Sequence, residues 1–462
     1  MCTVNVSELC DTFETEEITE NIITSSTIDA INVSNTESVC TKCGSQVEVS
    51  LRNKNGYCKT CFLSMSRHKF RATLGKSKLL RPNDSVLIGH SGKANSTVLL
   101  HLITADVNEP VSKKLKFQCK VLYIDDGMVK GLTIEERECI KSVLMKEAES
   151  LPLTVYTIPL LNCTIDSDCK QIHPTNIKQM STNEYNDTTL RKVFENLEND
   201  TAKDELLKQL RRKLLISAAR KLNCNKIFLA DTSLDLAIKI LGDVSTGRGS
   251  QLSLNVAFSD RRHEDIMLLR PLREFTGDDI ARYLDCYKLC PIFSSQKYNV
   301  PFSASIRNVA KNFVSKLDSE FYSTVSTIYR TSEKLATKCE KSNSTNINPN
   351  TLLNVCILCE APLDLCYPPE EKLSVVQAKW FSKFTSLGSM DALKKEKCQC
   401  HGSGCNSFEC ESSVKKYLCY SCNLIFLNSK KKDTILPNFM FSKIQEKFEL
   451  AKLQKELADF LL

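Results

Sequence analysis

The chain has 462 residues, a length at which two or three modules are expected rather than one core. Hydrophobic residues make up 42% and charged residues 25% of it, as in soluble globular proteins. No apolar run reaches the roughly 18 residues needed to cross a membrane. Residues 1–20 also lack the basic flank and apolar core of a secretory signal. We therefore expect neither a membrane-spanning nor a secreted protein.

The net charge of +7 is divided unevenly along the chain. Residues 1–39 hold eight acidic residues and no lysine or arginine, which leaves 62 basic against 47 acidic residues, a net charge of +15, for the remainder. This acidic leader is rich in serine and threonine and is expected to be disordered. The basic remainder suits a polyanionic partner.

The next module, residues 40–82, opens with two Cys-x-x-Cys pairs separated by fourteen residues. The chain has 23 cysteines without a secretory signal, a combination that favours metal ligands over disulfides in a reducing compartment. The spacing predicts a closed, structural Zn²⁺ site, with an iron–sulfur cluster as the alternative. The expected ligands are Cys40, Cys43, Cys58 and Cys61.

A basic segment closes this module. A compact zinc module followed by a basic helix predicts contacts with RNA phosphates, and a solvated helix face is the alternative. The residues predicted to bind RNA are Arg67, Lys69, Arg71, Lys76 and Lys78.

Residues 83–330 alternate apolar runs with helical patterns. The runs read VLIGH, CKVLYIDDG, LTVYTIPL, NKIFLAD and DIMLLRPLR. Such alternation predicts an α/β domain whose parallel sheet is covered on both faces. Ligands bind such sheets at the carboxyl ends of their strands. His263, in a dense charged loop of this domain, is expected to be a structural or interface residue.

The first of these runs leads into a candidate phosphate loop, in the text VLIGHSGKANSTVLL from Val86 to Leu100. A strand, a Ser-Gly turn and a helix opening with Ser-Thr can present backbone amides and a helix N-terminus to an anion. An ordinary strand-to-helix turn is the alternative. The loop residues are Ser91, Gly92, Lys93, Asn95 and Ser96.

Three segments follow the α/β domain. The composition predicts a polar linker over residues 331–355 and a cysteine-rich module over residues 356–440. Residues 441–462 are predicted to form a helix with an apolar stripe. That stripe is expected to dock on its own domain, and docking on a partner is the alternative. Two cysteine pairs at the ends of the second segment predict another zinc site: Cys356, Cys359, Cys419 and Cys422. Five further candidate ligands between them stay unassigned: Cys398, Cys400, His401, Cys405 and Cys410.

The candidate loop resembles the Ser-Gly-Gly-x-Asp-Ser pyrophosphatase loop of the ATP-dependent tRNA thiolation enzymes. Ser91, Gly92 and Ser96 match that pattern, whereas Lys93 replaces its second glycine and Asn95 its aspartate. A lysine restricts the positive φ and close approach that glycine permits. An asparagine lacks the charge that attracts Mg²⁺. ATP binding by this loop is therefore in question.

A longer stretch resembles one sister family more closely. The YIDDG turn at Tyr123–Gly127 resembles the acidic turn after the second strand in the same enzymes. GRGSQLSLNVAFSDRRHEDIMLLRPLREFTGDDIARYL is similar to the cytoplasmic tRNA 2-thiolation protein 2 family, and that resemblance covers about residues 40–330, the C-terminal cysteine pairs and the DFLL ending. The resemblance implies a PP-loop ATP pyrophosphatase fold, of the adenine nucleotide alpha hydrolase-like type, in a cytoplasmic protein.

The resemblance also implies a function. The chain would be a subunit of the complex that 2-thiolates wobble uridine in tRNA, in forming 5-methoxycarbonylmethyl-2-thiouridine. A catalytic sister subunit would activate the uridine with ATP and take sulfur from the thiocarboxylate of a ubiquitin-related carrier protein. This chain would complete the heterodimer and help to hold tRNA. No catalytic residue is expected in it.

The cysteine pattern supports that division of labour. Catalytic members carry a central Cys-x-x-Cys and a distant third cysteine, whereas Cys163 and Cys169 are too widely spaced to form such a pair. Cys224 precedes a strand and is expected to be a buried apolar residue. Two alternatives stay open. The chain could be an active ATP-dependent tRNA sulfurtransferase that uses Ser91, Gly92 and Ser96 on pyrophosphate and Cys224 on sulfur. It could also be a zinc-stabilised RNA-binding module.

Overall fold

The computed structural model describes residues 39–52, 55–107, 117–165, 174–176, 188–293, 302–321, 323–334, 355–363, 417–426 and 437–460. Most of the acidic leader, most of the linker and the five unassigned ligands of the cysteine-rich module lie outside these residues. In the described part of the chain, no helix is long and apolar enough to span a membrane.

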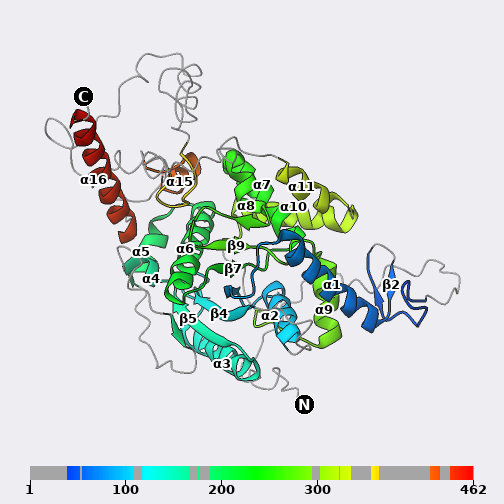
Figure 1. Cartoon of the computed structure of the whole chain (residues 1–462). Helices are drawn as coiled ribbons and strands as arrows, with labels where there is room; N and C mark the ends of the chain where they lie inside the picture. Colours follow the sequence, from blue (N-terminus) through cyan, green and yellow to red (C-terminus); the bar gives the residue numbers. More distant parts are fainter. Residues whose placement is uncertain are drawn as a thin grey trace.

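A seven-stranded sheet forms the centre of the molecule (Figure 1). Five of its strands are parallel neighbours, and they coincide with the five predicted apolar runs. They are β3 (Ser85–His90), β4 (Gln118–Asp125), β5 (Thr154–Pro159), β7 (Lys226–Phe228) and β9 (Met267–Leu269). Two short antiparallel strands, β6 (Thr175–Asn176) and β8 (Ser259–Asp260), form the edges.

The order of the strands separates two neighbouring loops, those that follow β3 and β7. In space the order is β6-β5-β4-β3-β7-β9-β8, so the chain runs outward from β3 to β5 and then returns to the other side of β3 as β7. The strand order reverses between β3 and β7. In doubly wound sheets the loops diverge at such a point and leave a crevice at the carboxyl edge.

Helices cover both faces of the sheet, as the alternation of strands and helices predicts. Val86 and Ile88 pack on one face against α1 (Lys59–Ser77), α2 (Ala94–Val107), α3 (Ile134–Ser150) and α9 (Gly277–Tyr287). Leu87 points to the other face, which is covered by α4 (Asn162–Ile165), α5 (Thr188–Asn196) and α6 (Asp200–Lys221). Buried side chains on both faces make the sheet rigid at the centre.

A smaller helical layer stands beyond the carboxyl edge of β7. It consists of α7 (Ser233–Ser245), α8 (Leu252–Val256), α10 (Ile306–Glu320) and α11 (Thr324–Glu333), with its own apolar clusters. α7 begins at a capping box, in which the Thr232 side chain and the Asp235 carboxylate accept each other's backbone N–H groups. This cap fixes the first turn of α7 beside β7.

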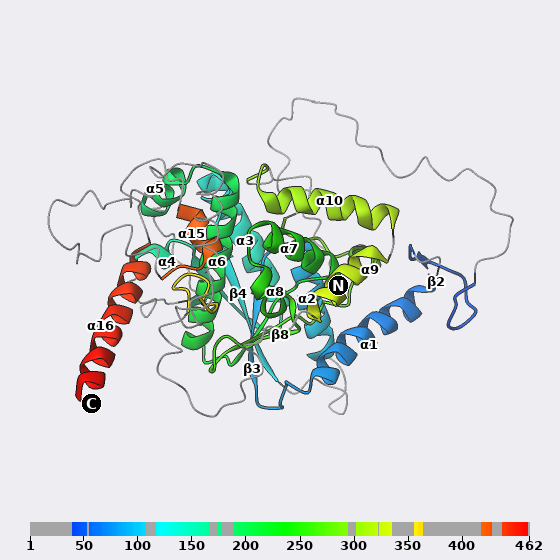
Figure 2. The same cartoon turned by 90° about the horizontal axis from the view of Figure 1, so that it is seen from above.

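The two cysteine modules lie at opposite ends of the molecule (Figures 1 and 2). The N-terminal module is the hairpin β1 (Val49–Ser50) and β2 (Gly56–Tyr57) at the start of α1. The C-terminal module includes α15 (Tyr420–Phe426) and continues into α16 (Asn438–Phe460) beside α4 and α6. Its buried residues belong to the same apolar cluster as α6, so this module shares the core of the sheet.

Candidate functional site at the carboxyl edge of the sheet

A cavity of about 350 Å³ opens where β3 and β7 diverge. Its lining includes Ser91 and Lys93 from the loop after β3, Ala230 and Asp231 from the segment after β7, and Lys208 from α6. This is the crevice that the strand order predicts. The volume is that of a small-molecule site.

Residues of the loop after β3 form hydrogen bonds with one another and with Phe293. The Ser96 hydroxyl accepts the Ser91 N–H at 3.2 Å and donates to the Lys93 carbonyl at 2.8 Å. The Gly92 carbonyl accepts the Phe293 N–H at 2.8 Å, and a Cβ on Gly92 (φ +71°) would lie 2.7 Å from the Phe293 ring. The Ser91 N–H and the Ser96 hydroxyl, two groups that a phosphate loop could offer to its ligand, are therefore used within the protein.

Asn95 has a partner in the segment after β7. Its side-chain amide donates to the Asp235 carboxylate at 2.6 Å, and the same carboxylate caps α7. Burial, followed by the charge of Asp231, raises the pKa of Asp235. An amide beside this carboxylate is compatible with that environment, whereas a second carboxylate would repel it.

The cavity wall is strongly cationic. Ten lysines and arginines line it, against three aspartates. Asp126 pairs with Lys130 at 2.7 Å and with Arg211, and Asp231 pairs with Arg270 at 3.0 Å. The aspartates are thus taken up by neighbours, and the wall keeps an excess of positive charge.

Two lysines show the effect of that excess. Burial lowers the pKa of Lys239 to about 7, and the charge of Arg270 lowers it further in the same direction. Lys93 remains accessible at the cavity mouth, yet the surrounding wall and the charges of Arg211, Lys130 and Arg307 lower its pKa to about 8. For both lysines burial is the main cause of the lowered pKa, and the neighbouring positive charges act in the same direction.

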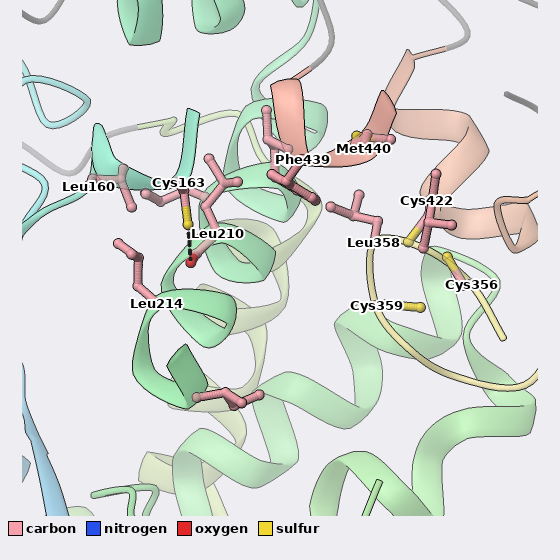
Figure 3. Close-up of a cluster of buried hydrophobic side chains, with 14 of the residues drawn as sticks. Leu160, Cys163, Leu210, Leu214, Cys356, Leu358, Cys359, Cys422, Phe439 and Met440 are labelled. Carbon is pink, nitrogen blue, oxygen red and sulfur yellow. Dashed lines mark hydrogen bonds between the residues drawn. The ribbon is translucent and has the colours of Figure 1, made fainter. Parts of the chain in front are cut away.

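The cysteines proposed for sulfur chemistry lie away from the cavity. Cys224 precedes β7 at the opposite, amino edge of the sheet, where its sulfur lies 3.4 Å from the Ser85 hydroxyl. It is 3% exposed, and burial raises its pKa, which confirms the prediction of a buried apolar residue. Cys163 is buried against α6 and donates to the Leu210 carbonyl (Figure 3). Among the described cysteines, Cys359 alone lines the cavity.

The N-terminal cysteines converge as the sequence predicts. The sulfurs of Cys40, Cys43, Cys58 and Cys61 all lie within 4.8 Å of one another, and those of Cys43 and Cys58 are 3.6 Å apart. Tetrahedral ligands at about 2.3 Å from Zn²⁺ would be separated by about 3.8 Å, so the group fits a metal ion of this size. The Cys58 backbone N–H lowers the pKa of Cys40 to about 6, which favours a thiolate ligand.

The C-terminal cysteines form a second such group inside the core (Figure 3). Cys356, Cys359, Cys419 and Cys422 are 0–5% exposed, and the sulfurs of Cys359 and Cys419 are 3.6 Å apart. The buried guanidinium of Arg248 lies 3.7 Å from the Cys422 sulfur and pairs with Glu205 at 2.9 Å. A metal ion with four thiolates carries net negative charge, which this guanidinium would balance.

A family model and the relatives of this chain carry the same description. The model described as cytoplasmic tRNA 2-thiolation protein 2 matches residues 305–424. Proteins of that name from Danio rerio and Homo sapiens are 28% and 26% identical to this chain, over 94% and 92% of it and 96% and 93% of theirs. Protein 2-A of Xenopus laevis is 29% identical, over 92% of this chain and 94% of its own.

Over most of its length the chain is similar to proteins of the cytoplasmic tRNA 2-thiolation protein 2 family. Among solved structures, it is similar to the U34-tRNA thiolase NcsA from Methanococcus maripaludis with its [4Fe-4S] cluster. The two chains are 18% identical, with a TM-score of 0.47, over 64% of this chain and 87% of the other. The structure confirms the predicted α/β domain with its parallel strands and places a four-cysteine group at each end of the molecule.

Some basic side chains of helix α1 contact other residues of the protein. Lys69 pairs with Asp279 of α9 at 2.7 Å, and Arg67 donates to the Tyr287 hydroxyl at 3.0 Å. Lys76 and Lys78 are exposed at the far end of the helix. RNA binding by α1 therefore stays a prediction, and Lys76 and Lys78 are the residues most available for it.

The sequence did not predict two residues of the cavity wall, Lys239 and Arg307. Lys239 stands alone in the apolar text LAIKIL, and a lone charge at a core position was the signal that could have identified it. Arg307 had no such signal, because only the fold brings it to the cavity. Glu360, directly after Cys359, pairs with His263 at 2.8 Å and with Lys443 at 3.0 Å, which gives His263 its structural role.

Proposed function

We propose that this protein is a non-catalytic subunit of the cytoplasmic complex that 2-thiolates wobble uridine in tRNA. The similarity to the cytoplasmic tRNA 2-thiolation protein 2 family supports the pathway and the compartment. One observation carries the non-catalytic role: Asn95 is hydrogen-bonded to Asp235 at the place where a magnesium-binding carboxylate would be needed. The cavity thus keeps the architecture of an ATP site without its metal-binding chemistry.

The sulfur chemistry supports the same assignment. A sulfur-transferring cysteine needs access to the reacting atoms and a thiolate at neutral pH. Cys224 lies at the wrong edge of the sheet, and Cys359 belongs to the buried four-cysteine group. By resemblance, ATP activation and the use of sulfur from a thiocarboxylated ubiquitin-related carrier belong to a catalytic sister subunit in a heterodimer.

Both four-cysteine groups are proposed to hold structural Zn²⁺. Each offers four soft ligands with sulfur separations near the tetrahedral value, and no fifth protein ligand accompanies either group among the described residues. Bound Zn²⁺ would fix the chain path and leave no open coordination position for chemistry. An iron–sulfur cluster is the alternative, and visible absorption of the purified protein distinguishes it from colourless Zn²⁺.

The proposal is tested by assaying thiolation of tRNA with purified components. We expect no 2-thiouridine from this chain alone, little from the catalytic sister alone, and full formation from the two together. Thiolation by this chain alone would instead establish it as an active sulfurtransferase. Full activity of the sister without this chain, together with normal 2-thiouridine in cells that lack it, would leave only a zinc-stabilised RNA-binding module.

A second assay uses the altered loop directly. Cells lacking this protein should lose 2-thiouridine, and the double variant Asn95→Ala, Ser96→Ala should restore it. A catalytic loop would not tolerate that change, whereas a loop that only shapes the cavity would. Failure of a folded double variant to restore 2-thiouridine would contradict the non-catalytic role.

A further inference from the structure

A cationic groove runs along α1 where this helix lies beside α9 (Figures 1 and 2). Its volume is about 540 Å³. Most of its lining comes from one face of α1, because residues three, four, seven and eight positions apart share a helix face. The lining includes Lys59, Leu63, Arg67, His68 and Arg71 of α1, with Tyr287 of α9. No carboxylate is among the described residues that line the groove, so it offers positive charge beside two largely apolar side chains.

The groove is long enough to hold a segment of extended chain. From Lys59 to Arg71 the axis of α1 advances by about 18 Å, which is the length of about five extended residues. Near the middle, Arg67 donates to the Tyr287 hydroxyl at 3.0 Å and so joins the two walls. Lys59 is exposed, whereas Leu63 and Tyr287 are half-buried. These features suit a peptide that combines carboxylates with apolar side chains.

The acidic leader, residues 1–39, joins the rest of the chain next to this groove. The sulfur of Cys40 lies within 4.8 Å of the sulfurs of Cys58 and Cys61, which flank the residue at which α1 begins. Val39 therefore lies close to the first turn of α1, where the groove starts. Residues 21–38 number eighteen, and a chain of that length reaches up to about 60 Å. The part of the leader before residue 21 can thus reach the whole groove.

The composition of the leader is complementary to that of the groove. The leader contains eight acidic residues and no lysine or arginine. Five of the eight lie within residues 11–20, namely Asp11, Glu14, Glu16, Glu17 and Glu20. Phe13 and Ile18 stand among them and match the apolar surface of Leu63 and Tyr287. Because a short tether gives an effective concentration in the millimolar range, even a weak site for this segment would be occupied.

We propose that residues 11–20 of the acidic leader dock in the groove between α1 and α9 and close it to other polyanions. Lysine and arginine hold carboxylates through charge-assisted hydrogen bonds, and the apolar side chains of the segment cover Leu63 and Tyr287. The groove is thus a surface for an acidic peptide, and this chain supplies that peptide itself. The inference goes beyond the proposed function and does not depend on it.

Carbodiimide coupling of the full chain tests the contact directly, because it joins a carboxylate to a lysine amine only where the two groups touch. We expect cross-links between residues 11–20 and Lys59, in a yield that does not change with protein concentration. Lys316 is the control, since its side chain on α10 is 77% exposed and lies outside the groove, and it should receive about fivefold fewer cross-links from the leader. No cross-link to Lys59, an equal share at Lys316, or a yield that rises with concentration would overturn the proposal.

Binding of a labelled peptide of residues 8–23 provides a second test. The leader of the full chain is neutralised by Asp11→Asn, Glu14→Gln, Glu16→Gln, Glu17→Gln and Glu20→Gln. This variant should bind the peptide about tenfold or more tightly than wild type, in which the chain's own leader competes. Fluorescence anisotropy measures both affinities. Equal binding by the two proteins would overturn the proposal.

Substitutions in the groove locate the peptide. In the chain with the neutralised leader, Lys59→Gln with Arg71→Gln should weaken peptide binding by about tenfold or more. Lys316→Gln with Lys452→Gln removes the same charge outside the groove and should change it less than about twofold. Thermal unfolding confirms that each variant is folded before titration. Binding of tRNA that depends on Lys59 and Arg71, without binding of the peptide, would overturn the proposal and assign the groove to RNA.

Discussion

At the scale of single residues, this protein differs from a phosphate-loop enzyme by substitutions whose partners are visible. Asn95 donates to Asp235, so an uncharged amide sits where two carboxylates would repel each other. Lys93 reaches the mouth of a cationic cavity, which disfavours its own charge. Each substitution makes physical sense only beside its neighbour across the cavity.

Replacing Asn95 by aspartate should show how strongly this position is coupled to Asp235. Asn95→Asp replaces a hydrogen bond of 2.6 Å by two facing carboxylates, and we expect a loss of about 1–3 kcal/mol in the free energy of unfolding at pH 7. The loss should shrink toward pH 5, because the carboxylate pair of the folded protein binds a proton more readily than the unfolded chain. Millimolar Mg²⁺ should recover part of it.

Urea unfolding at both pH values, with and without Mg²⁺, measures these effects. Asn95→Ala is the control, since it removes the hydrogen bond without adding charge and should respond to neither pH nor Mg²⁺. Identical stability of Asn95→Asp and wild type under all conditions would contradict the assigned contact.

Lys239 gives a second prediction at this scale, with the sign set by its lowered pKa. Burial, Arg270 and Lys208 lower that pKa to about 7, while Asp231 and Asp243 act in the opposite direction. Between pH 7 and 10 the unfolded chain therefore binds more protons, and stability rises with pH. Lys239→Met removes the penalty, so we expect it to stabilise the protein by about 1–4 kcal/mol at pH 6 and much less at pH 10.

Chemical denaturation across this pH range provides the measurement. Lys316→Met, at a side chain 77% exposed, should show no such trend. A Lys239→Met variant that is less stable than wild type at pH 6 would show that the ammonium group contributes more than its burial removes.

At the scale of elements, the two cysteine modules differ in how deeply their cysteines are buried in the core. The N-terminal group is partly exposed, beside a two-stranded hairpin. The C-terminal group is buried in the cluster that also contains Leu210 and Leu214 of α6. Loss of metal should therefore unfold a local module in the first case and disturb the main core in the second.

Single ligand substitutions distinguish the two modules. Cys422→Ser should lose one metal equivalent and lower the melting temperature of the sheet domain by about 10 °C or more, since the free energy of a structural metal site stabilises the surrounding fold. Cys43→Ser should also lose one equivalent, yet change the main transition by less than about 3 °C. Metal analysis and scanning calorimetry give both values. Equal shifts in the two variants would contradict the different burial of the groups.

At the scale of the whole molecule, α1 carries the N-terminal module away from the sheet (Figure 2). The middle of that helix is held by the Lys69–Asp279 pair, while Lys76 and Lys78 remain exposed. A basic helix fixed at one side of the body is suited to phosphates of a long, folded RNA.

Neutralising the exposed pair tests this surface. Lys76→Gln with Lys78→Gln should weaken tRNA binding and reduce the slope of log K against log salt by about 1–2. Filter binding at several salt concentrations measures the slope. Lys316→Gln with Lys452→Gln removes the same charge from α10 and α16 and serves as the control. An unchanged slope in the α1 variant would exclude this surface from RNA binding.

The amino-acid sequence by itself determined the repeating pattern of this protein. Five apolar runs fixed the parallel strands, and cysteine spacing fixed both four-cysteine groups, because periodicity and ligand spacing are local properties. Only the tertiary structure decided what surrounds the loop. The Asn95–Asp235 bond joins residues 140 positions apart, and Lys93, Lys239 and Arg307 meet only because the strand order reverses at β3 and β7. Contacts across that crevice depend on the order of strands, which no local pattern encodes.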